Sequence, residues 1–595
     1  MDSSLTLADH AVIAGFFVVM LGVGFYFSTR MRDLQDYFSG GRRVPWWLSG
    51  VSLYMSAFSA FLFVAYSALA YQYGWVAVTA CWTTVPAMMV SAVFFAARWR
   101  RATTTSPLEY IRVRYGAVLR QGLAWLGIPM TVIDDGLKLF AIGTLVSVGL
   151  GIGDLSVGNI ELDSLQVAIL ASGLIMLTYT FLGGLWAVLV TDFVQFVVMV
   201  VAVVVLVPLA LDRVGGLGQF FANTPEGFFR LTQDPDAEGS KYTWFYLFVF
   251  LVIMVLSYCS RWSFVQRYYS VRTDRDARKV GYLVAFLSLV GPPILFFPAM
   301  AARVFLPGVE DPNQVYMLLC KDLLPVGMIG MLIAAMFSAT MSMLSSDYNA
   351  VAAVVTNDVC KPLFIPNASD RTYVWIGRIS TLAIGVVSLG IGLLVASALQ
   401  DQDLFQLMAR LFGVFLPPIA IPMLVGLLSR KASHAGALVG FLVGIVAGLA
   451  AYSFGSVVGL LTGDADLAKR LNDTLRYLTI ITPITVVTTL LGLFVGTWLS
   501  PNSEEKQEAV DRFLEGVRAN RAEAQEGRRV ATGTSPAPVI GTAVGALGAL
   551  VVVVMILSPW VGQGSWVTLS VGCVMMAVGV ACWQLPSGTN SATDE

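Results

Sequence analysis

The chain has 595 residues, of which 57% are hydrophobic and only 13% are charged. Soluble proteins carry about 25% charged residues, so this composition excludes an ordinary water-soluble fold and indicates that lipid surrounds much of the chain. The net charge of −1 gives no field that would attract nucleic acid, and six scattered cysteines with two histidines favour neither a disulfide framework nor a metal cage.

Apolar stretches close to the roughly 20 residues that a helix needs to cross a bilayer recur along the chain. They predict an all-α polytopic membrane protein with about 15 transmembrane helices. The expected spans are 9–29, 47–72, 74–97, 121–150, 160–182, 184–210, 242–262, 280–305, 324–356, 374–399, 402–429, 433–455, 474–499, 537–557 and 564–584. Spans 121–150 and 324–356 exceed the thickness of a bilayer, so we expect them to be tilted, kinked or interrupted.

The positive charges of the connecting loops predict the orientation. With the N-terminus placed outside, the inner loops hold 25 of the 37 Lys and Arg residues and the outer loops hold 6. This asymmetry follows the positive-inside rule, and a missed or invented span would scramble it. Residues 1–9 contain no basic stretch and do not resemble a cleaved signal peptide. We therefore expect a multi-pass protein of the plasma membrane or bacterial inner membrane with its N-terminus outside.

Several charged residues fall inside predicted spans, where charge is costly and often marks a solute or ion site. They are Asp134, Asp135, Lys138, Asp192, Arg261 and Asp347. The alternative interpretation is that these residues only pair with one another. Arg261, for example, could pair with Asp134 or Asp135.

Span 324–356 also carries Ser338, Ser342, Ser345 and Ser346, which share one helix face through spacings of three and four residues. Membrane serines often bond only to the preceding turn of their own helix. Hydroxyls near a carboxylate also suit an alkali cation, because hard cations prefer oxygen ligands. Sodium is our chemical interpretation, with a proton as the alternative. Span 47–72 is rich in small residues and could unwind at mid-membrane to offer carbonyl oxygens.

Five segments, in the right order, resemble motifs of the sodium/solute symporter family, which includes carriers of sugars, proline, sialic acid, iodide and vitamins. They are TSPLEYIRVRYG at 105–116, GGLWAVLVTDFVQ at 183–195, SRWSFVQRYYSVRTDRDARK at 260–279, AAMFSATMSMLSSDYNAVAAVVTND at 334–358 and GALVG at 436–440. Each motif alone is weak evidence for the family, and the five motifs in the right order are strong evidence.

The resemblance implies a fold with two inverted five-helix repeats, in which the first helix of each repeat is broken and solute lies between the breaks. It divides the chain into a series of segments. These are an extra N-terminal helix and cytoplasmic loop (1–46), a first repeat (47–210), a second repeat (242–429), two further helices (433–499), a cytoplasmic linker (500–536) and two C-terminal helices with a tail (537–595).

The resemblance also implies where sodium binds. The main site of relatives maps onto Met55, Phe58 and Ala339, through their carbonyls, and onto Ser342. Its last position is Met343, whose thioether is a poor sodium ligand, so this site is weakened unless water or Ser346 substitutes. A second site, known in some relatives and the one we expect to hold sodium, maps onto Asp192, Ser342, Ser345 and Ser346.

The solute is harder to predict. Relatives that carry sugar acids place an arginine where this chain has Asp134, and sugar carriers place an amide where it has Arg261. An Asp/Arg pair could bind a polyhydroxylated sugar through charge-assisted hydrogen bonds, and Arg261 could equally hold a carboxylate. The predicted solute site comprises Asp134, Asp135, Arg261, Tyr54 and Trp262.

We therefore expect a sodium-coupled secondary active symporter that imports a small polar solute, with a sugar or sugar derivative as the first candidate. The alternative solutes are a carboxylate, such as a sugar acid or monocarboxylate, and an amino acid. A transporter-like sensor would need an attached signalling domain, and a membrane enzyme would need a nucleophile, metal cluster or phosphate-binding loop. The sequence shows neither a signalling domain of that kind nor such a catalytic group, and we expect no enzyme activity and no cofactor. The expected partners are the solute, sodium and the lipid bilayer, with a monomer as the functional unit.

Overall fold

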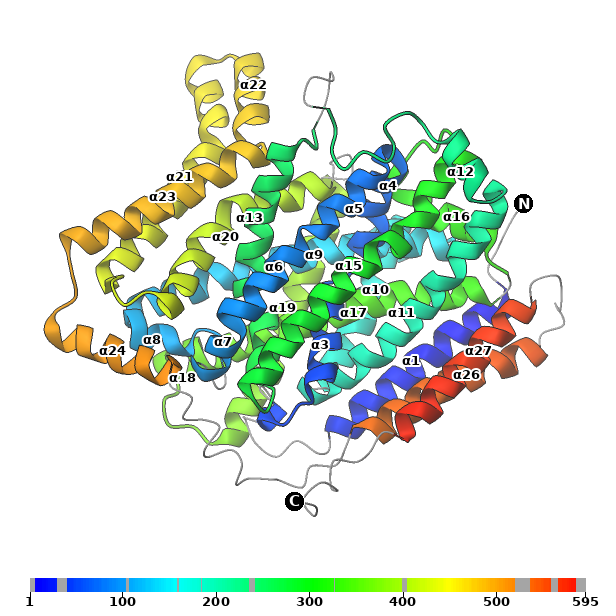
Figure 1. The fold of residues 1–595 in the computed structure, drawn as a ribbon, viewed down its shortest axis with the longest axis horizontal. Helices are drawn as coiled ribbons and strands as arrows, with labels where there is room; N and C mark the ends of the chain where they lie inside the picture. The colour runs from blue at the N-terminus through cyan, green and yellow to red at the C-terminus, as the bar shows by residue number, and fades with distance from the viewer. Residues whose placement is uncertain are drawn as a thin grey trace.

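The computed structural model describes residues 6–28, 40–102, 106–157, 160–182, 185–234, 241–325, 327–398, 404–518, 536–557 and 565–584. Within these ranges the chain is almost wholly helical (Figure 1). A short antiparallel hairpin joins β1 (Leu155–Val157) to β2 (Ile160–Leu162). This confirms the predicted fold class.

Each predicted span lies on a helix or on a run of consecutive helices. The N-terminal part contains α1 (Leu7–Ser28), η1 (Gly40–Arg42), α3 (Trp46–Met55), η2 (Leu62–Tyr66), α4 (Ser67–Tyr73), α5 (Trp75–Trp82), α6 (Thr84–Val90), η3 (Ser91–Phe95), α7 (Ala96–Ala102), α8 (Glu109–Tyr115), α9 (Ala117–Leu150), α10 (Ser164–Leu182), α11 (Leu185–Val214) and α12 (Leu217–Asn223). The middle part contains α13 (Trp244–Ser260), α14 (Trp262–Tyr269), α15 (Asp274–Phe305), η4 (Pro312–Gln314), α16 (Val315–Leu323), α17 (Met328–Val354), η5 (Val355–Cys360), α18 (Lys361–Leu363), α19 (Asp370–Ala398) and α20 (Leu404–Leu428). The C-terminal part contains α21 (His434–Thr462), α22 (Ala465–Leu475), α23 (Leu478–Leu499), α24 (Glu504–Arg518), α26 (Ala537–Leu557) and α27 (Ser565–Trp583).

The described helices do not all have the apolar character of a simple span. By length and hydropathy, 11 of them can cross a membrane, or 12 when the bent pair α13–α14 counts as one span. The other three predicted spans are also helical. The first is broken between α3 and α4, α9 carries several buried charges, and the third is helix α10, at Ser164–Leu182.

Two helix breaks face the centre of the molecule. Helix α3 ends at Met55, and the chain becomes helical again only after residues 56–59. Helices α13 and α14 meet at Arg261, whose φ of −58° and ψ of 129° are not helical, and their axes differ by 47°. Both breaks lie on the spans predicted to be broken. The long helix α9 contains Pro129, whose ring removes one backbone hydrogen bond, and α17 continues into the π-helical turn η5.

Helix α17 is the centre of the protein, and all 27 of its residues are buried. It packs against α1, α3, α9, α11, α14 and α19. The two C-terminal helices α26 and α27 lie side by side and pack on α1, while α21 and α23 form a pair at the opposite edge (Figure 1). The start of the predicted linker is helix α24, which packs on α7 and α8, and residues 519–535 lie outside the described residues.

Candidate functional site

Two buried polar clusters lie along α17, the helix on which the sequence places its row of serines. Ser342, Ser345 and Ser346 are fully buried, and Asp347 is 2% exposed. Consecutive residues of a helix point about 100° apart, so Ser346 and Asp347 reach different neighbouring helices. The two clusters are therefore separate sites supported by one rigid element.

The first cluster, here called the ion-pair cluster, joins five ionisable side chains. They are Asp134, Asp135 and Lys138 on α9, Arg261 at the α13–α14 break, and Asp347 on α17. Lys138 Nζ lies 2.9 Å from Asp134 Oδ2, 2.6 Å from Asp135 Oδ1 and 2.8 Å from Asp347 Oδ2. Arg261 Nη2 lies 2.7 Å from Asp134 Oδ2 and 2.6 Å from Asp347 Oδ2. The pairing of Arg261 with Asp134 that the sequence left open is thus present.

A cavity of about 50 Å³ opens beside the ion-pair cluster, between α9, the α13–α14 break and α20. It is lined by Gly127, Met130, Thr131, Asp134, Ser257, Ser260, Arg261, Trp262, Phe412, Leu416 and Ile419. Of the predicted solute residues, Asp134, Arg261 and Trp262 line this cavity. A side chain at Gly127 would collide with the Trp262 ring, since a Cβ there would lie 2.5 Å from ring atom Cζ2. The cavity has room for a few water molecules, so a sugar-sized solute requires these helices to separate.

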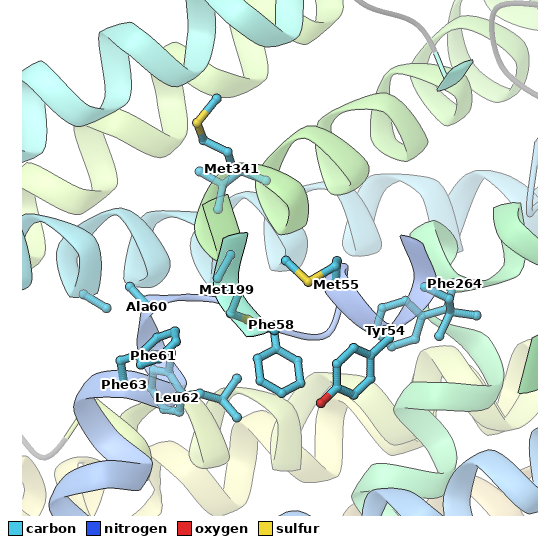
Figure 2. Close-up of a cluster of buried hydrophobic side chains, with 14 of the residues drawn as sticks. Tyr54, Met55, Phe58, Ala60, Phe61, Leu62, Phe63, Met199, Phe264 and Met341 are labelled. Carbon is cyan, nitrogen blue, oxygen red and sulfur yellow. The ribbon is translucent and has the colours of Figure 1, made fainter. Parts of the chain in front are cut away.

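The remaining predicted solute residues lie apart from the cavity. Asp135 is buried behind it in the ion-pair cluster, where its Oδ1 accepts the Lys138 hydrogen bond. Tyr54 belongs to the apolar cluster around the α3 break, which Figure 2 shows. Its ring centroid lies 4.6 Å from that of Phe58 and 6.0 Å from that of Phe196.

The second cluster, here called the Asp192 cluster, brings α3, α11, α14 and α17 together. Its members are Ser52, Asp192, Arg267, Ser342 and Ser346. Ser52 Oγ donates a short hydrogen bond to Asp192 Oδ2. Arg267 Nη2 lies 2.6 Å from Ser346 Oγ and 3.5 Å from Asp192 Oδ2, and its Nε lies 3.1 Å from Ser52 Oγ.

This cluster retains oxygen atoms that are not fully used. Ser342 neighbours the Asp192 carboxylate, yet the buried atoms Asp192 Oδ1 and Ser342 Oγ make no well-formed hydrogen bond. A carboxylate oxygen and a hydroxyl oxygen are the donors that a hard monovalent cation prefers, so the donor set fits sodium. Arg267 contacts the opposite carboxylate oxygen and leaves Oδ1 open. Ser345, the fourth predicted ligand, donates a hydrogen bond to the Ser342 carbonyl within its own helix.

The break after α3 contacts α17 at two points near the predicted main sodium site. Ser56 Oγ lies 2.8 Å from Ser346 Oγ, and the Ala60 N–H donates to Thr340 Oγ1 at 2.8 Å. The Met55 carbonyl accepts a hydrogen bond from the Phe58 N–H at 2.9 Å. Figure 2 shows Met55 and Phe58 at this break, among the rings of Tyr54 and Phe61. Ala339 and Ser342 are both buried in α17. Ala339 is next to Thr340, and Ser342 lies one turn before Ser346.

Sequence reasoning missed some members of these clusters. Lys138 and Asp347 stood out as buried charges, but neither was assigned to the solute site that they support. Arg267 was noticed only as part of a Gln-Arg motif, although a fully buried arginine must have an anionic or multiply accepting partner. Ser52 carries no signal beyond its place among small residues.

The profile of the family described as the sodium:solute symporter family matches residues 37–444. Curated relatives are similar along most of the chain. A sodium/sialic acid symporter of Proteus mirabilis is 25% identical over 461 residues, which cover 74% of this chain and 89% of the relative. A sodium/glucose cotransporter of Vibrio parahaemolyticus is 26% identical over 470 residues, covering 74% and 84%. Sodium/myo-inositol cotransporter 2 of Bos taurus is 27% identical over 499 residues, covering 77% and 70%.

Two solved structures share the fold. A sodium-coupled sialic acid symporter in a substrate-bound outward-open state superimposes with a TM-score of 0.70 at 20% identity, covering 84% of this chain and 99% of the other. Mhp1, a nucleobase-cation-symport-1 family transporter in a closed conformation, gives a TM-score of 0.50 at 15% identity, covering 80% and 98%. At these identities the likeness shows the inverted-repeat fold alone.

Proposed function

This chain belongs to the sodium:solute symporter family and is a sodium-coupled solute symporter rather than an enzyme, and on this premise we propose that it imports a neutral polyhydroxylated solute, a sugar or sugar derivative. The observation that carries the proposal is the charge balance beside the cavity. Arg261 already contacts two carboxylates, those of Asp134 and Asp347. Lys138 in turn contacts three carboxylates, so neither cation of the ion-pair cluster is left unpaired to attract an anionic solute.

The polar lining of the cavity suits a solute with several hydroxyl groups. A sugar hydroxyl can donate to Asp134 while another accepts from Arg261, and charge-assisted hydrogen bonds of this kind are stronger than neutral ones. The hydroxyls of Thr131, Ser257 and Ser260 can extend the same pattern. The indole of Trp262 supplies an apolar face at the edge of the cavity, where the less polar face of a sugar ring can lie.

We further propose that sodium binds at the Asp192 cluster, with Asp192 Oδ1 and the Ser342 hydroxyl as ligands. The unfilled hydrogen-bonding capacity of these two buried atoms supports this assignment. The site predicted at Met55, Phe58, Ala339 and Ser342 remains a second candidate. Met343 offers no oxygen there, and the Ser346 hydroxyl that would replace it already contacts Arg267.

Two coarser features belong to the same proposal. The excess of Lys and Arg in alternate loops supports an N-terminus on the outer side of a plasma or bacterial inner membrane. We also propose that the protein functions as a monomer.

A thermal-shift screen of the purified protein tests the solute assignment. D-Glucose, D-galactose, D-mannose, myo-inositol, sialic acid, lactate and L-proline would each be added in sodium chloride and in potassium chloride. Since a ligand stabilises the state it binds, we expect one or more neutral polyols to raise the unfolding midpoint more in sodium than in potassium. Uptake of the same compound into proteoliposomes should then require an inward sodium gradient.

Two variants test whether the solute binds at the cavity. Asp134→Asn should abolish the stabilisation by the polyol, and Asp322→Asn, in an exposed ion pair with Arg213, should retain it. Stabilisation by sialic acid or lactate alone would replace the sugar with a carboxylate as the solute. Stabilisation by L-proline alone would make the solute an amino acid, held by Asp134 and Arg261 through its two opposite charges.

A further inference from the structure

The ion-pair cluster carries one more negative than positive group. Asp134, Asp135 and Asp347 face the two cations Lys138 and Arg261. The three carboxylates and the lysine are at most 3% exposed. An unmatched charge in the middle of a membrane protein is costly, so a further cation must reach this cluster from water.

A metal ion does not fit among the three carboxylates while Lys138 is in place. One oxygen from each carboxylate lies within 4.8 Å of the others, an arrangement that could in principle hold a metal ion. However, Lys138 Nζ already contacts an oxygen of all three, at 2.6–2.9 Å. The ammonium group occupies the position that a metal would need. A proton requires only one free carboxylate oxygen.

Asp135 supplies that oxygen. Among the described residues, its buried Oδ2 atom has no hydrogen-bond partner and its Oδ1 accepts a hydrogen bond from Lys138 alone. Asp134 and Asp347 each accept an additional hydrogen bond from Arg261. Asp135 is therefore the carboxylate whose negative charge is least compensated.

Among the described residues, no cation other than Lys138 forms an ion pair with Asp135, and Arg410 of α20, the helix across the cavity, forms none with the cluster. The helix of Asp135 presents Asp134 and Lys138, α17 presents Asp347 and Tyr348, and the α13–α14 break presents Arg261. The described part of α10 contains no charged residue, and the charged residues of α19, which are Asp370, Arg371 and Arg378, lie in its first three turns. Gly136, next to Asp135, contacts α19 much further along, at Ser388 and Ile391.

We propose that the ion-pair cluster is a proton-binding site, with the proton held on Asp135, and that its occupancy is linked to solute binding. The proton comes from water and returns to water, and no covalent bond other than O–H forms or breaks. When Asp135 loses the proton, its full negative charge attracts Lys138 more strongly and weakens the hold of Lys138 on Asp134 and Asp347. Those two carboxylates position Arg261 at the cavity, so the solute binds best to the protonated cluster.

Infrared spectroscopy tests the proton site without knowledge of the solute. At neutral pH the purified protein should show the C=O stretching band of a buried protonated carboxylic acid. Asp135→Asn should lose it. Lys138→Gln, which removes a cation, should gain a second protonated carboxyl. Asp274→Asn, which removes a buried carboxylate already paired with Arg100 and Arg101, should leave the band unchanged.

The infrared results decide the proposal in either direction. A band that persists unaltered in Asp135→Asn, or its absence from the unmodified protein at neutral pH, would overturn it. If Asp135→Asn does not fold, Asp134→Asn provides the same test. Removing that carboxylate also balances the cluster, so Asp135 should release its proton and the band should disappear.

A second measurement tests the link to the solute, and this step rests on the proposed function. With D-glucose as the probe in sodium chloride, the rise in unfolding midpoint should fall at pH values above the one at which the infrared band disappears. In Asp135→Asn the rise should not depend on pH over that range. A pH-independent rise in the unmodified protein would refute the linkage. If D-glucose stabilises the protein at no pH, the polyol that does so in the screen replaces it as the probe; if none of the four polyols stabilises the protein, the sugar assignment fails, and the infrared result still decides the proton site.

Discussion

Replacing Lys138 should destabilise the protein more than replacing Asp135, although the two residues form one ion pair. Lys138→Gln leaves the three buried carboxyl groups opposite Arg261 alone and removes three ion-pair contacts of 2.6–2.9 Å. Removing one partner of a buried ion pair costs about 3–5 kcal/mol, because the other charge stays buried without compensation. Asp135→Asn instead replaces a carboxyl group that holds the proposed proton with a neutral amide and removes a single contact, and losing one hydrogen-bond partner in a buried site costs about 1–3 kcal/mol.

The assay is thermal unfolding of the purified variants in one detergent at neutral pH. We expect the unfolding midpoint to fall in the order unmodified protein, Asp135→Asn, Lys138→Gln. Lys138→Arg keeps a cation but changes its geometry, so its unfolding midpoint should lie between those of Asp135→Asn and Lys138→Gln. If Asp135→Asn were as damaging as Lys138→Gln, Asp135 would be a charged partner of Lys138 rather than the protonated carboxyl of the cluster, and the reasoning from charge balance would be refuted.

The remaining predictions concern the sodium site and two contacts near the ends of the helices. Asp192→Asn should raise the sodium concentration needed for half-maximal stabilisation by at least about 10- to 100-fold, because Asp192 is a proposed ligand and the loss of a group that only supports a ligand already has that effect, whereas Asp322→Asn should not change it. Arg120→Gln should lower the free energy of unfolding by about 3–5 kcal/mol, since Arg120 Nε lies 2.6 Å from the buried Asp358 Oδ1; a loss near zero in denaturant titration would contradict this. Leu514→Ala, at a fully buried position of α24, should weaken the docking of that helix by about 2–5 kcal/mol and expose it to limited proteolysis, and unchanged cleavage would show that α24 is held by other contacts.

The sequence was sufficient to predict the helices because a membrane demands long apolar segments. Span 324–356 is predicted from its length and composition, and the structure has α17 and its π-helical extension there. Helical spacing also predicts that Asp134 and Lys138, four residues apart, lie on one face of α9. Local spacing accounts for this contact without any knowledge of the tertiary fold.

The partners of these residues could not be predicted in the same way. Lys138 and Asp347 are 209 residues apart, and Arg267 and Ser346 are 79 residues apart. Only the packing of α9 and α14 against α17 brings them together. The alternative that Arg261 pairs with Asp134 was open at the sequence level, but its simultaneous contact with Asp347 was not expected. This second contact changes the chemistry of the cavity, because it leaves Arg261 little capacity to bind an anion.

The two clusters share two rigid elements, and this arrangement gives coupling a physical route. Helix α17 supplies Ser346 to the Asp192 cluster and the adjacent Asp347 to the ion-pair cluster. Helix α14 supplies Arg267 to the first, and the break at its N-terminal end supplies Arg261 to the second. A sodium ion bound at Asp192 would share the Asp192 carboxylate with Arg267. A shift of Arg267 would then move α14, the short helix that begins directly after Arg261. The solute contacts Arg261, so sodium and solute would both bias the position of α14. Coupling of this kind is reciprocal: the solute must increase sodium affinity by the same factor by which sodium increases solute affinity.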